Sequence, residues 1–327
     1  MTGVQFNPTT DIPSLAGKVI FVTGGTQYLT YSSGKLPNII LTNTTGTAGL
    51  GKESILQFAK HQPAHIYFSG RNSKTADAVI SEVQAAQPDT QITFLQCDLA
   101  SLASVSKAAK QFTSQSPRLD ILLCNAGIMA HPPALTSDGY EIQFGTNHLG
   151  HALLIKLLLP TLQRTAAQPN ADVRIVSNTS LGFKGHPGRG IAFNDLRTKQ
   201  EYPVIGHWIR YGQSKLANIL YAQELARRYP SITSTSVHPG VISTGLVTDL
   251  GFWNKALVYV TNVGKMLTLE QGACNQLWAA TADKEQITNG GFYEPVGVPG
   301  THDKLSNDEK LAGELWDWTQ KELEGYE

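Results

Sequence analysis

The sequence has little charge imbalance that would attract a charged partner. Lys plus Arg and Asp plus Glu number 26 each, so the formal net charge is zero, and no long run of like charge supplies a local field. This argues against nucleic acid or an acidic membrane as a partner. No window reaches the roughly 18 apolar residues that a spanning helix requires, and the start of the chain lacks a signal-peptide pattern. We therefore expect a soluble, cytoplasmic protein without a membrane span.

The sequence also has few cysteines, and it lacks the spacing of side chains that a metal site needs. The chain has three cysteines, Cys97, Cys124 and Cys274, an odd number at wide spacings, which is typical of reduced core residues in a cytosolic protein. His148 and His151 lie three apart, but no third ligand with matching spacing accompanies them. The sequence therefore predicts no metal site.

What the chain does contain is a regular alternation of strand-length apolar runs and helical segments. Such alternation is typical of parallel strands joined by right-handed crossovers and covered by helices on both faces. No linker-like stretch divides the chain, so we expect one doubly wound α/β domain over residues 1–327, with about seven parallel strands. The expected strands are 19–23, 65–69, 92–96, 121–124, 173–177 and 233–237, with a last one within 290–295. The expected helices are 54–60, 76–86, 105–112, 150–162, 214–228 and 311–323.

A glycine-rich turn follows the first expected strand, but it is cut in two. Its halves are Thr23-Gly24-Gly25-Thr26 and Ala48-Gly49-Leu50-Gly51. Joined, they would read T-G-G-T-A-G-L-G between a strand and a helix. Glycines in that place let the backbone approach a diphosphate at a helix N-terminus. The turn predicts a dinucleotide site.

The segment between the halves, Thr26 to Gly46, has three explanations. It is a tolerated surface loop, a switch element that occludes the site, or a retained intron. We favour the intron, because removing these residues restores the motif without a change of frame, and the Gly-Thr pairs at both borders permit a junction inside a glycine codon. If the insertion breaks the turn, the chain is a non-catalytic scaffold or an inactive isoform, which stays open as the alternative to an enzyme.

Further motifs give the chain a family resemblance. They are Asn125-Ala126-Gly127 after a strand, Asn147 in a helix, Ser180 after a strand, Tyr211-Gly212-Gln213-Ser214-Lys215, and Pro239-Gly240 followed by Thr244. In this order they resemble the short-chain dehydrogenase/reductase family, nearest to its retinol-dehydrogenase-like and fungal members, over about residues 15–300. The resemblance implies a Rossmann-type fold, a nicotinamide cofactor and oxidoreductase activity. It leaves a monomer, a dimer and a tetramer open.

Tyr211 and Lys215 lie four apart and therefore on one face of a helix that we expect to begin there. An isolated phenol has a pKa of about 10. A neighbouring ammonium and an oxidised nicotinamide favour the phenolate and so lower this pKa. This makes Tyr211 the predicted general acid and base.

The resemblance supplies the remaining catalytic roles. Lys215 would also hydrogen bond the nicotinamide ribose. Ser180 would orient and polarise the substrate oxygen, with Thr179 and Ser177 as rivals. Asn147 would hold a water leading from the lysine to solvent.

The cofactor contacts are likewise implied by the resemblance. They are Gly24, Gly25, Thr47, Gly49, Leu50, Gly51, Arg71, Asp98, Asn125, Ala126, Gly127, Tyr211, Lys215, Pro239, Gly240 and Thr244. The loop after the second strand reads Ser69-Gly70-Arg71-Asn72. A basic residue there meets a 2′-phosphate, whereas an acidic one meets a 2′-hydroxyl. Arg71 without an acidic neighbour predicts NADP(H).

Residues 240–275 occupy the place where the family covers its substrate. The stretch 250–260 is apolar and aromatic, and we interpret it as a lid over a small apolar carbonyl or alcohol. Peripheral membrane contact and core packing remain open alternatives. The predicted function is an NADP(H)-dependent oxidoreductase that moves hydride between nicotinamide and an apolar secondary alcohol or ketone, or an aldehyde.

Overall fold

Eight strands form one sheet in the computed structural model, which describes residues 3–24, 49–242 and 266–326. The order is β10-β9-β6-β5-β4-β1-β2-β3. Neighbouring strands are parallel from β3 to β9, and β10 joins β9 antiparallel. The strands are β1 (Val19–Thr23), β2 (His65–Gly70), β3 (Ile92–Gln96), β4 (Ile121–Cys124), β5 (Arg174–Asn178), β6 (Thr233–Val237), β9 (Phe292–Glu294) and β10 (Val298–Pro299). A separate parallel pair joins β7 (Val241–Ile242) and β8 (Met266–Leu267).

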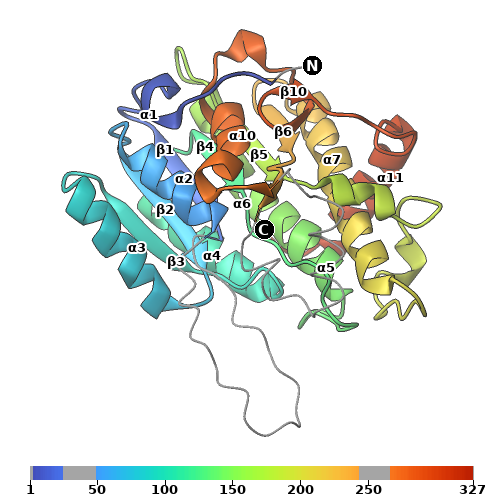
Figure 1. Ribbon diagram of the computed structural model, residues 1–327. Coiled ribbons are helices and arrows are strands. Elements are labelled where there is room, and N and C mark those ends of the chain that lie inside the picture. Colours follow the sequence, from blue (N-terminus) through green and yellow to red (C-terminus); the bar gives the residue numbers. More distant parts are fainter. Residues whose placement is uncertain (1–2, 25–48, 243–265, 327) are drawn as a thin grey trace, which may run out of the picture.

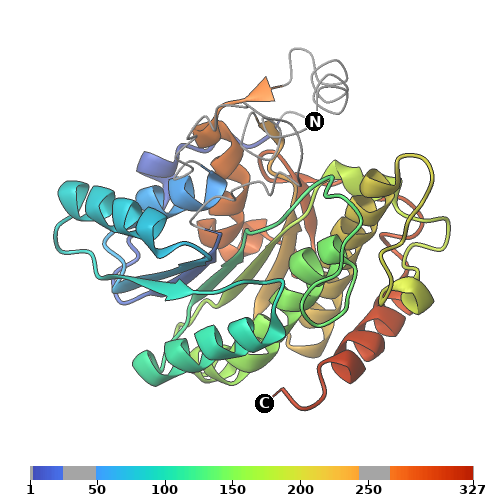
Figure 2. The ribbon, with the colours of Figure 1, turned by 90° about the horizontal axis from the view of Figure 1, so that it is seen from below.

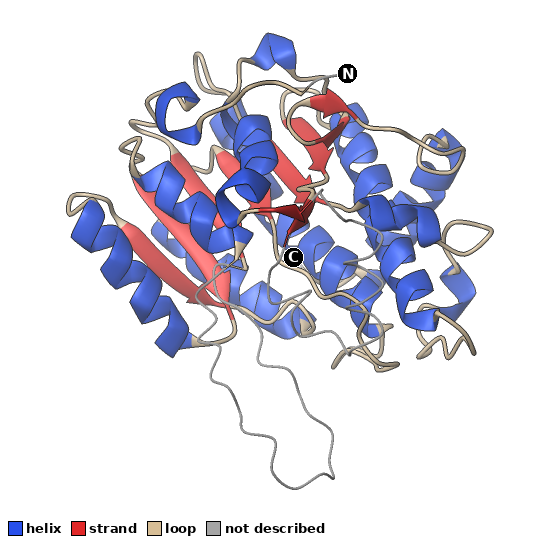
Figure 3. Cartoon of the chain, viewed as in Figure 1, coloured by secondary structure: helices blue, strands red, loops and turns tan. Residues whose placement is uncertain are grey.

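Helices cover both faces of this sheet (Figures 1 and 3). One face carries α2 (Leu50–Ala59), α3 (Ser73–Ala86) and α10 (Leu269–Thr281). The other face carries α4 (Leu102–Gln115), α6 (Gly150–Ala166), α7 (Gly206–Arg228) and α11 (Glu309–Glu322). Figure 2 shows the two layers on opposite sides of the strands. The shorter elements are α1 (Pro8–Asp11), α5 (Ile142–Phe144), a π-helical turn (Gly145–Leu149) and 3-10 turns at Leu181–Gly185, Phe193–Asp195 and Lys284–Gln286.

The side-chain alternation of the strands builds the two hydrophobic cores. In β1, Phe21 packs with the α4 side, whereas Ile20 and Val22 pack with the α2 side. Phe112 of α4 stacks on Phe21 at 5.4 Å between ring centroids. Each such fully buried side chain contributes about 1.5–3 kcal/mol. Burial on both faces explains why the central strands β1 and β4 read as nearly continuous apolar runs.

The expected doubly wound α/β sheet is confirmed. The bounds of β1, β3, β4 and β6 agree with the expected ones, while β5 starts one residue later and the short β10 makes the sheet eight-stranded. Helix α7 begins at Gly206, before Tyr211, so the helix start expected from the sequence is wrong. The buried Arg210 guanidinium holds this added turn, because it contacts Glu141 at 3.2 Å and donates to the carbonyls of Gln200 and His131.

The parallel strands end at a common edge. Thr23, Cys124, Asn178 and Val237 are the last residues of β1, β4, β5 and β6. In sheets of this type ligands bind outside the carboxyl ends of the strands. Among the helices described, none is both long and apolar enough to cross a membrane.

Candidate active site

Ser180 and Tyr211 meet beyond the end of β5. A Cβ placed on Gly182 would lie 3.0 Å from Tyr211 Cε1 and 3.3 Å from Ser180 Oγ, so both side chains border this glycine. The Ser180 hydroxyl is close enough to Tyr211 to lower the pKa of its phenol, against the larger effect of burial. The turn that carries Ser180 approaches α7 closely, since a Cβ on Gly212 would lie 2.7 Å from the carbonyl carbon of Gly185. Glycine at 212 therefore sets the distance between the two hydroxyls.

The two other hydroxyls of this segment face elsewhere. Thr179 Oγ1 donates to the carbonyl of Lys215 at 2.7 Å, and Ser177 lines a small cavity between α6, α7 and the sheet. The geometry thus favours Ser180 over its rivals as the partner of Tyr211.

Lys215 lies one turn after Tyr211 and is buried. Its Nζ is 5.7 Å from the centre of the Tyr211 ring and donates to the carbonyl of Asn178 at 3.1 Å. Burial lowers the pKa of Lys215 to about 8, because the interior disfavours the ammonium. Burial raises the pKa of Tyr211 to about 12, against the smaller, opposing effect of the Ser180 hydroxyl. The surrounding protein therefore raises the Tyr211 pKa, opposite to the direction expected from the Tyr–Lys spacing alone.

Asn147 lies in the π-helical turn and clamps the loop after β4. Its Oδ1 accepts from the backbone N–H of Ile128 at 2.7 Å, and its Nδ2 donates to the carbonyl of Ile128 and to Ser214 Oγ, each at 2.9 Å. A Cβ on Gly127 would lie 3.0 Å from Asn147 Oδ1 and 3.4 Å from Lys215 Nζ. Asn147 is thus next to the lysine, and its role in holding a water stays a prediction.

The glycine turn lies at the neighbouring end of β1. Gly24 has a φ of +76°, and a Cβ there would lie 2.8 Å from the Cα of Ala126, so this position requires glycine. A Cβ on Gly51 would lie 2.5 Å from the carbonyl oxygen of Gly24. Gly49 precedes α2 and caps it with no side chain, and within the described residues its Cβ side is open. These features fit a diphosphate at the helix N-terminus, where backbone N–H groups need an acceptor.

The loop after β4 is bonded to that turn. Asn125 Nδ2 donates to the carbonyl of Thr23 at 2.9 Å. The backbone N–H groups of Asn125 and Ala126 donate to Thr23 Oγ1 at 3.0 and 3.1 Å. The segment Asn125–Gly127 is therefore held against the first strand, as its predicted place beneath a ribose requires.

The other predicted cofactor residues follow the same edge. Arg71 is exposed and lies between the end of β2 and Asn72, which is the N-cap residue of α3. Asp98 follows β3 and accepts from the backbone N–H of Ala100 at 3.0 Å. Leu50 opens α2, while Pro239 and Gly240 follow β6, and Gly240 has a φ of +89°. Gly25, Thr47 and Thr244, the segment Thr26 to Gly46 and the expected lid at 250–260 lie outside the described residues.

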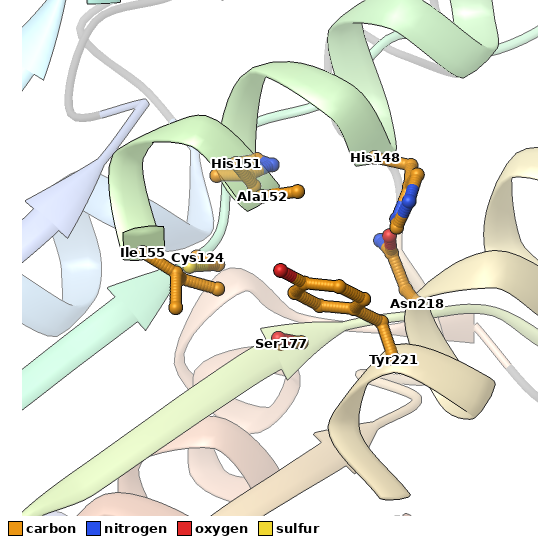
Figure 4. Close-up of a pocket in the computed structure, with 8 residues that line it drawn as sticks. All are labelled: Cys124, His148, His151, Ala152, Ile155, Ser177, Asn218 and Tyr221. Carbon is orange, nitrogen blue, oxygen red and sulfur yellow. The ribbon is translucent and has the colours of Figure 1, made fainter. Parts of the chain in front are cut away.

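A small cavity with room for about one water molecule lies between α6, α7 and the ends of β4 and β5 (Figure 4). The figure shows the hydroxyl of Tyr221 pointing into it. It is lined by Cys124, His148, His151, Ala152, Ile155, Ser177, Asn218 and Tyr221. Burial lowers the pKa of His148 to about 3 and that of His151 to about 4, so both stay neutral. The cavity is too small for a cofactor, and the described part of the chain holds no cluster of three or more potential metal ligands.

The sequence analysis missed Asn178, whose backbone carbonyl accepts a hydrogen bond from Lys215. The available signal was an amide side chain at the end of a buried strand, two residues before Ser180. A polar residue in that place needs partners.

Comparisons with known proteins confirm the family resemblance and the fold. A family model described as "short chain dehydrogenase" matches residues 39–190, a match that begins inside the insertion. The short-chain dehydrogenase/reductase drtF of Aspergillus calidoustus is 37% identical over 95% of each chain. Human retinol dehydrogenase 11 is 34% identical, with 88% of this chain and 86% of the relative covered. A crystal structure of an uncharacterized protein from Mycobacterium paratuberculosis superposes with a TM-score of 0.69 at 27% identity, covering 98% of this chain and 97% of that one.

Proposed function

The chain belongs to the short-chain dehydrogenase/reductase family, and from this we propose that it is an NADP(H)-dependent oxidoreductase acting on an apolar secondary alcohol or ketone, or an aldehyde. Members of this family are oxidoreductases that use NAD or NADP. The observation that carries the proposal is the placement of Ser180 and Tyr211 against the same glycine, Gly182, one helical turn from the buried Lys215.

Tyr211 is the proposed general acid and base. In reduction its hydroxyl proton passes to the substrate oxygen, and in oxidation the phenolate receives that proton from the alcohol. Because burial holds the Tyr211 pKa near 12, the phenolate needs nearby positive charge. The Lys215 ammonium supplies it, and Ser180 Oγ orients the substrate oxygen towards Tyr211.

The cofactor would lie along the carboxyl edge of the sheet. When bound, the nicotinamide supplies or accepts the hydride. Gly24, Gly49 and Gly51 leave room for the diphosphate beside α2, and Asn125–Gly127 would pass beneath the adenosine ribose. Arg71 would meet the 2′-phosphate of NADP, since the loop from Ser69 to Asn72 has no acidic residue. The whole chain would then form one NAD(P)-binding domain.

The substrate class is supported by sequence and by similarity. Residues 250–260 are apolar or aromatic apart from Gly251, Asn254 and Lys255, and one relative is named a retinol dehydrogenase, an enzyme of an apolar alcohol. We therefore expect an apolar body next to the reacting oxygen, with residues 240–275 covering it.

A substrate panel tests this proposal. The purified chain would be assayed with apolar ketones and aldehydes plus NADPH or NADH, and with secondary alcohols plus NADP⁺ or NAD⁺. We expect turnover of apolar members with the phosphorylated cofactor at least about tenfold better by kcat/KM. A preference for NADH would contradict the cofactor assignment, and no turnover with any pair would contradict the enzyme assignment.

A further inference from the structure

Asn178, at the end of β5, is bonded to both halves of the proposed site. It is 5% exposed. Its Nδ2 donates to Gln276 Oε1 at 2.6 Å and to Asn125 Oδ1 at 3.1 Å. Its carbonyl oxygen accepts from Lys215 Nζ at 3.1 Å and from Asn218 Nδ2 at 3.0 Å. Asn178 thus contacts the catalytic lysine through its backbone carbonyl, and its side chain contacts the amide side chains of Gln276 and Asn125.

The acceptors around Gln276 and Asn125 determine which end of each side-chain amide, oxygen or nitrogen, faces Asn178. Gln276 Nε2 donates to the carbonyl of Leu50 at 3.2 Å and to Ser54 Oγ at 2.6 Å, and Asn125 Nδ2 donates to the carbonyl of Thr23. The oxygens of Gln276 and Asn125 must therefore face Asn178. Only a side chain with two donors on one nitrogen satisfies both, which an amide does and a carboxylate does not.

Gln276 extends this connection to the first turn of α2. It is fully buried on α10, and α10 packs on α2 so closely that a Cβ on Gly272 would lie 3.0 Å from Leu50 Cδ2. Its bonds to Leu50 and Ser54 hold the helix end at which the diphosphate would bind. Since Asn178, Gln276 and Ser54 are buried, losing one of these bonds leaves a buried polar group unpaired and loosens the contact between the elements it joined.

We propose that Asn178 and Gln276 are positioning residues that fix the N-terminus of α2 relative to Lys215. The connection runs from α2 through Gln276 and the side chain of Asn178 to its carbonyl and the lysine. It rests on the proposed function, because it holds the dinucleotide between its diphosphate end, at α2, and its nicotinamide ribose end, at Lys215. Asn178 and Gln276 touch neither end of the cofactor in this scheme.

The test measures NADPH affinity of the folded protein by nicotinamide fluorescence. The variants are Asn178→Leu, Gln276→Leu and the double variant, each first checked by circular dichroism and thermal unfolding. The matched control is Gln213→Leu. Gln213 is an equally buried glutamine, and it bonds Ala192 N–H and Gln200 instead of α2.

Each single variant is expected to bind NADPH about tenfold more weakly, corresponding to the loss of one buried hydrogen bond. The double variant is expected to lose no more NADPH affinity than the single variant that binds NADPH more weakly, because both residues act through one connection. The control is expected to lose stability but stay within about twofold of wild-type affinity. If Asn178→Leu does not fold, the contrast between Gln276→Leu and Gln213→Leu decides alone.

Unchanged affinity in the folded single variants would overturn the proposal, and so would losses that multiply in the double variant. An equal loss in Gln213→Leu would reduce the effect to general destabilisation and overturn it as well. These results differ from a failure of the proposed function, in which wild type itself would not bind NADPH.

Discussion

The two halves of the carboxyl edge are built on opposite principles. On the α7 side, the site consists of side chains, those of Ser180, Tyr211 and Lys215. On the α2 side it consists of missing side chains, since a Cβ at Gly24 or Gly51 would collide with backbone. In the proposed function, catalysis therefore depends on side chains that are present, and cofactor binding depends on glycines that have no side chain. The segment Thr26 to Gly46 stands between the two sequence halves of the glycine turn, whereas the proposed catalytic residues Ser180, Tyr211 and Lys215 lie on the α7 side.

The largest expected effect comes from Lys215→Met on the catalytic side. Removing the ammonium takes away the charge that favours the Tyr211 phenolate, so kcat should fall by about 10²- to 10⁴-fold. Steady-state rates at saturating NADPH measure this. A variant that keeps more than a tenth of wild-type kcat would contradict the role of Lys215.

The same variant is expected to be more stable at neutral pH. Burial lowers the folded-state pKa of Lys215 from 10.5 to about 8, so below pH 8 both states are protonated and the folded state bears the full cost of the buried charge. Between about pH 8 and 10.5 the unfolded chain holds the proton that the folded chain releases, and wild-type stability gains. Lys215→Met should thus be about 1–3 kcal/mol more stable at pH 7, with the difference vanishing near pH 10.5 in urea unfolding. A difference that does not change with pH would contradict this.

On the binding side, Gly51→Ala is expected to weaken NADPH binding by about tenfold to a hundredfold, since the new methyl meets the Gly24 carbonyl oxygen and costs about 1–3 kcal/mol. It should also lower the unfolding temperature. Gly49→Ala, whose Cβ would meet no atom of the described residues within 4 Å, should weaken binding without loss of stability. Gly313→Ala, inside α11, should leave binding unchanged and raise the stability by about 0.5–1 kcal/mol, because alanine favours the helix over glycine. Titration and thermal unfolding of the three variants separate these cases. A loss of stability in Gly49→Ala would show that its open side serves the fold and no ligand.

The contrast between the halves also explains what the sequence could predict. The bounds of β1 and β4 followed directly, because these strands are buried on both faces and read as nearly continuous apolar runs. The sequences of β3 and β6 are less apolar, and their bounds followed from the alternation of strand-length and helical segments. The start of α7 did not, because its first turn depends on the buried Arg210–Glu141 contact between distant segments. The Asn178–Gln276 bond joins residues 98 apart, and no local pattern indicates such a pair. The predicted site residues within the described ranges do come to one edge, because the motifs stand where parallel strands end.

Arg71 tests the adenosine end of the binding half. Arg71→Ala should lower the affinity for NADPH by about tenfold and leave that for NADH within about twofold, because the 2′-phosphate alone loses its partner. Parallel titrations with the two cofactors give the ratio. Equal losses for both would mean that Arg71 acts on the loop and not on the phosphate.

The smallest expected change comes from removing the interruption. Joining Gly25 to Thr47 restores T-G-G-T-A-G-L-G, and the shortened chain should bind NADPH at least as tightly as the full chain. Weaker binding would mean that residues 26–46 contribute to the site, which would contradict the intron hypothesis. Genomic DNA without splice signals around those codons would contradict it independently.

The separation of chemistry from binding is tested most directly by Tyr211→Phe. NADPH affinity and NADPH-dependent reduction would be measured on the same preparation, with the best substrate of the panel. We predict an affinity for NADPH within about twofold of wild type, because phenylalanine keeps the ring and leaves the shape of the site unchanged. We predict a kcat lower by about 10²- to 10⁴-fold, because the variant has no ionisable hydroxyl to transfer the proton. Normal turnover by Tyr211→Phe would contradict the account.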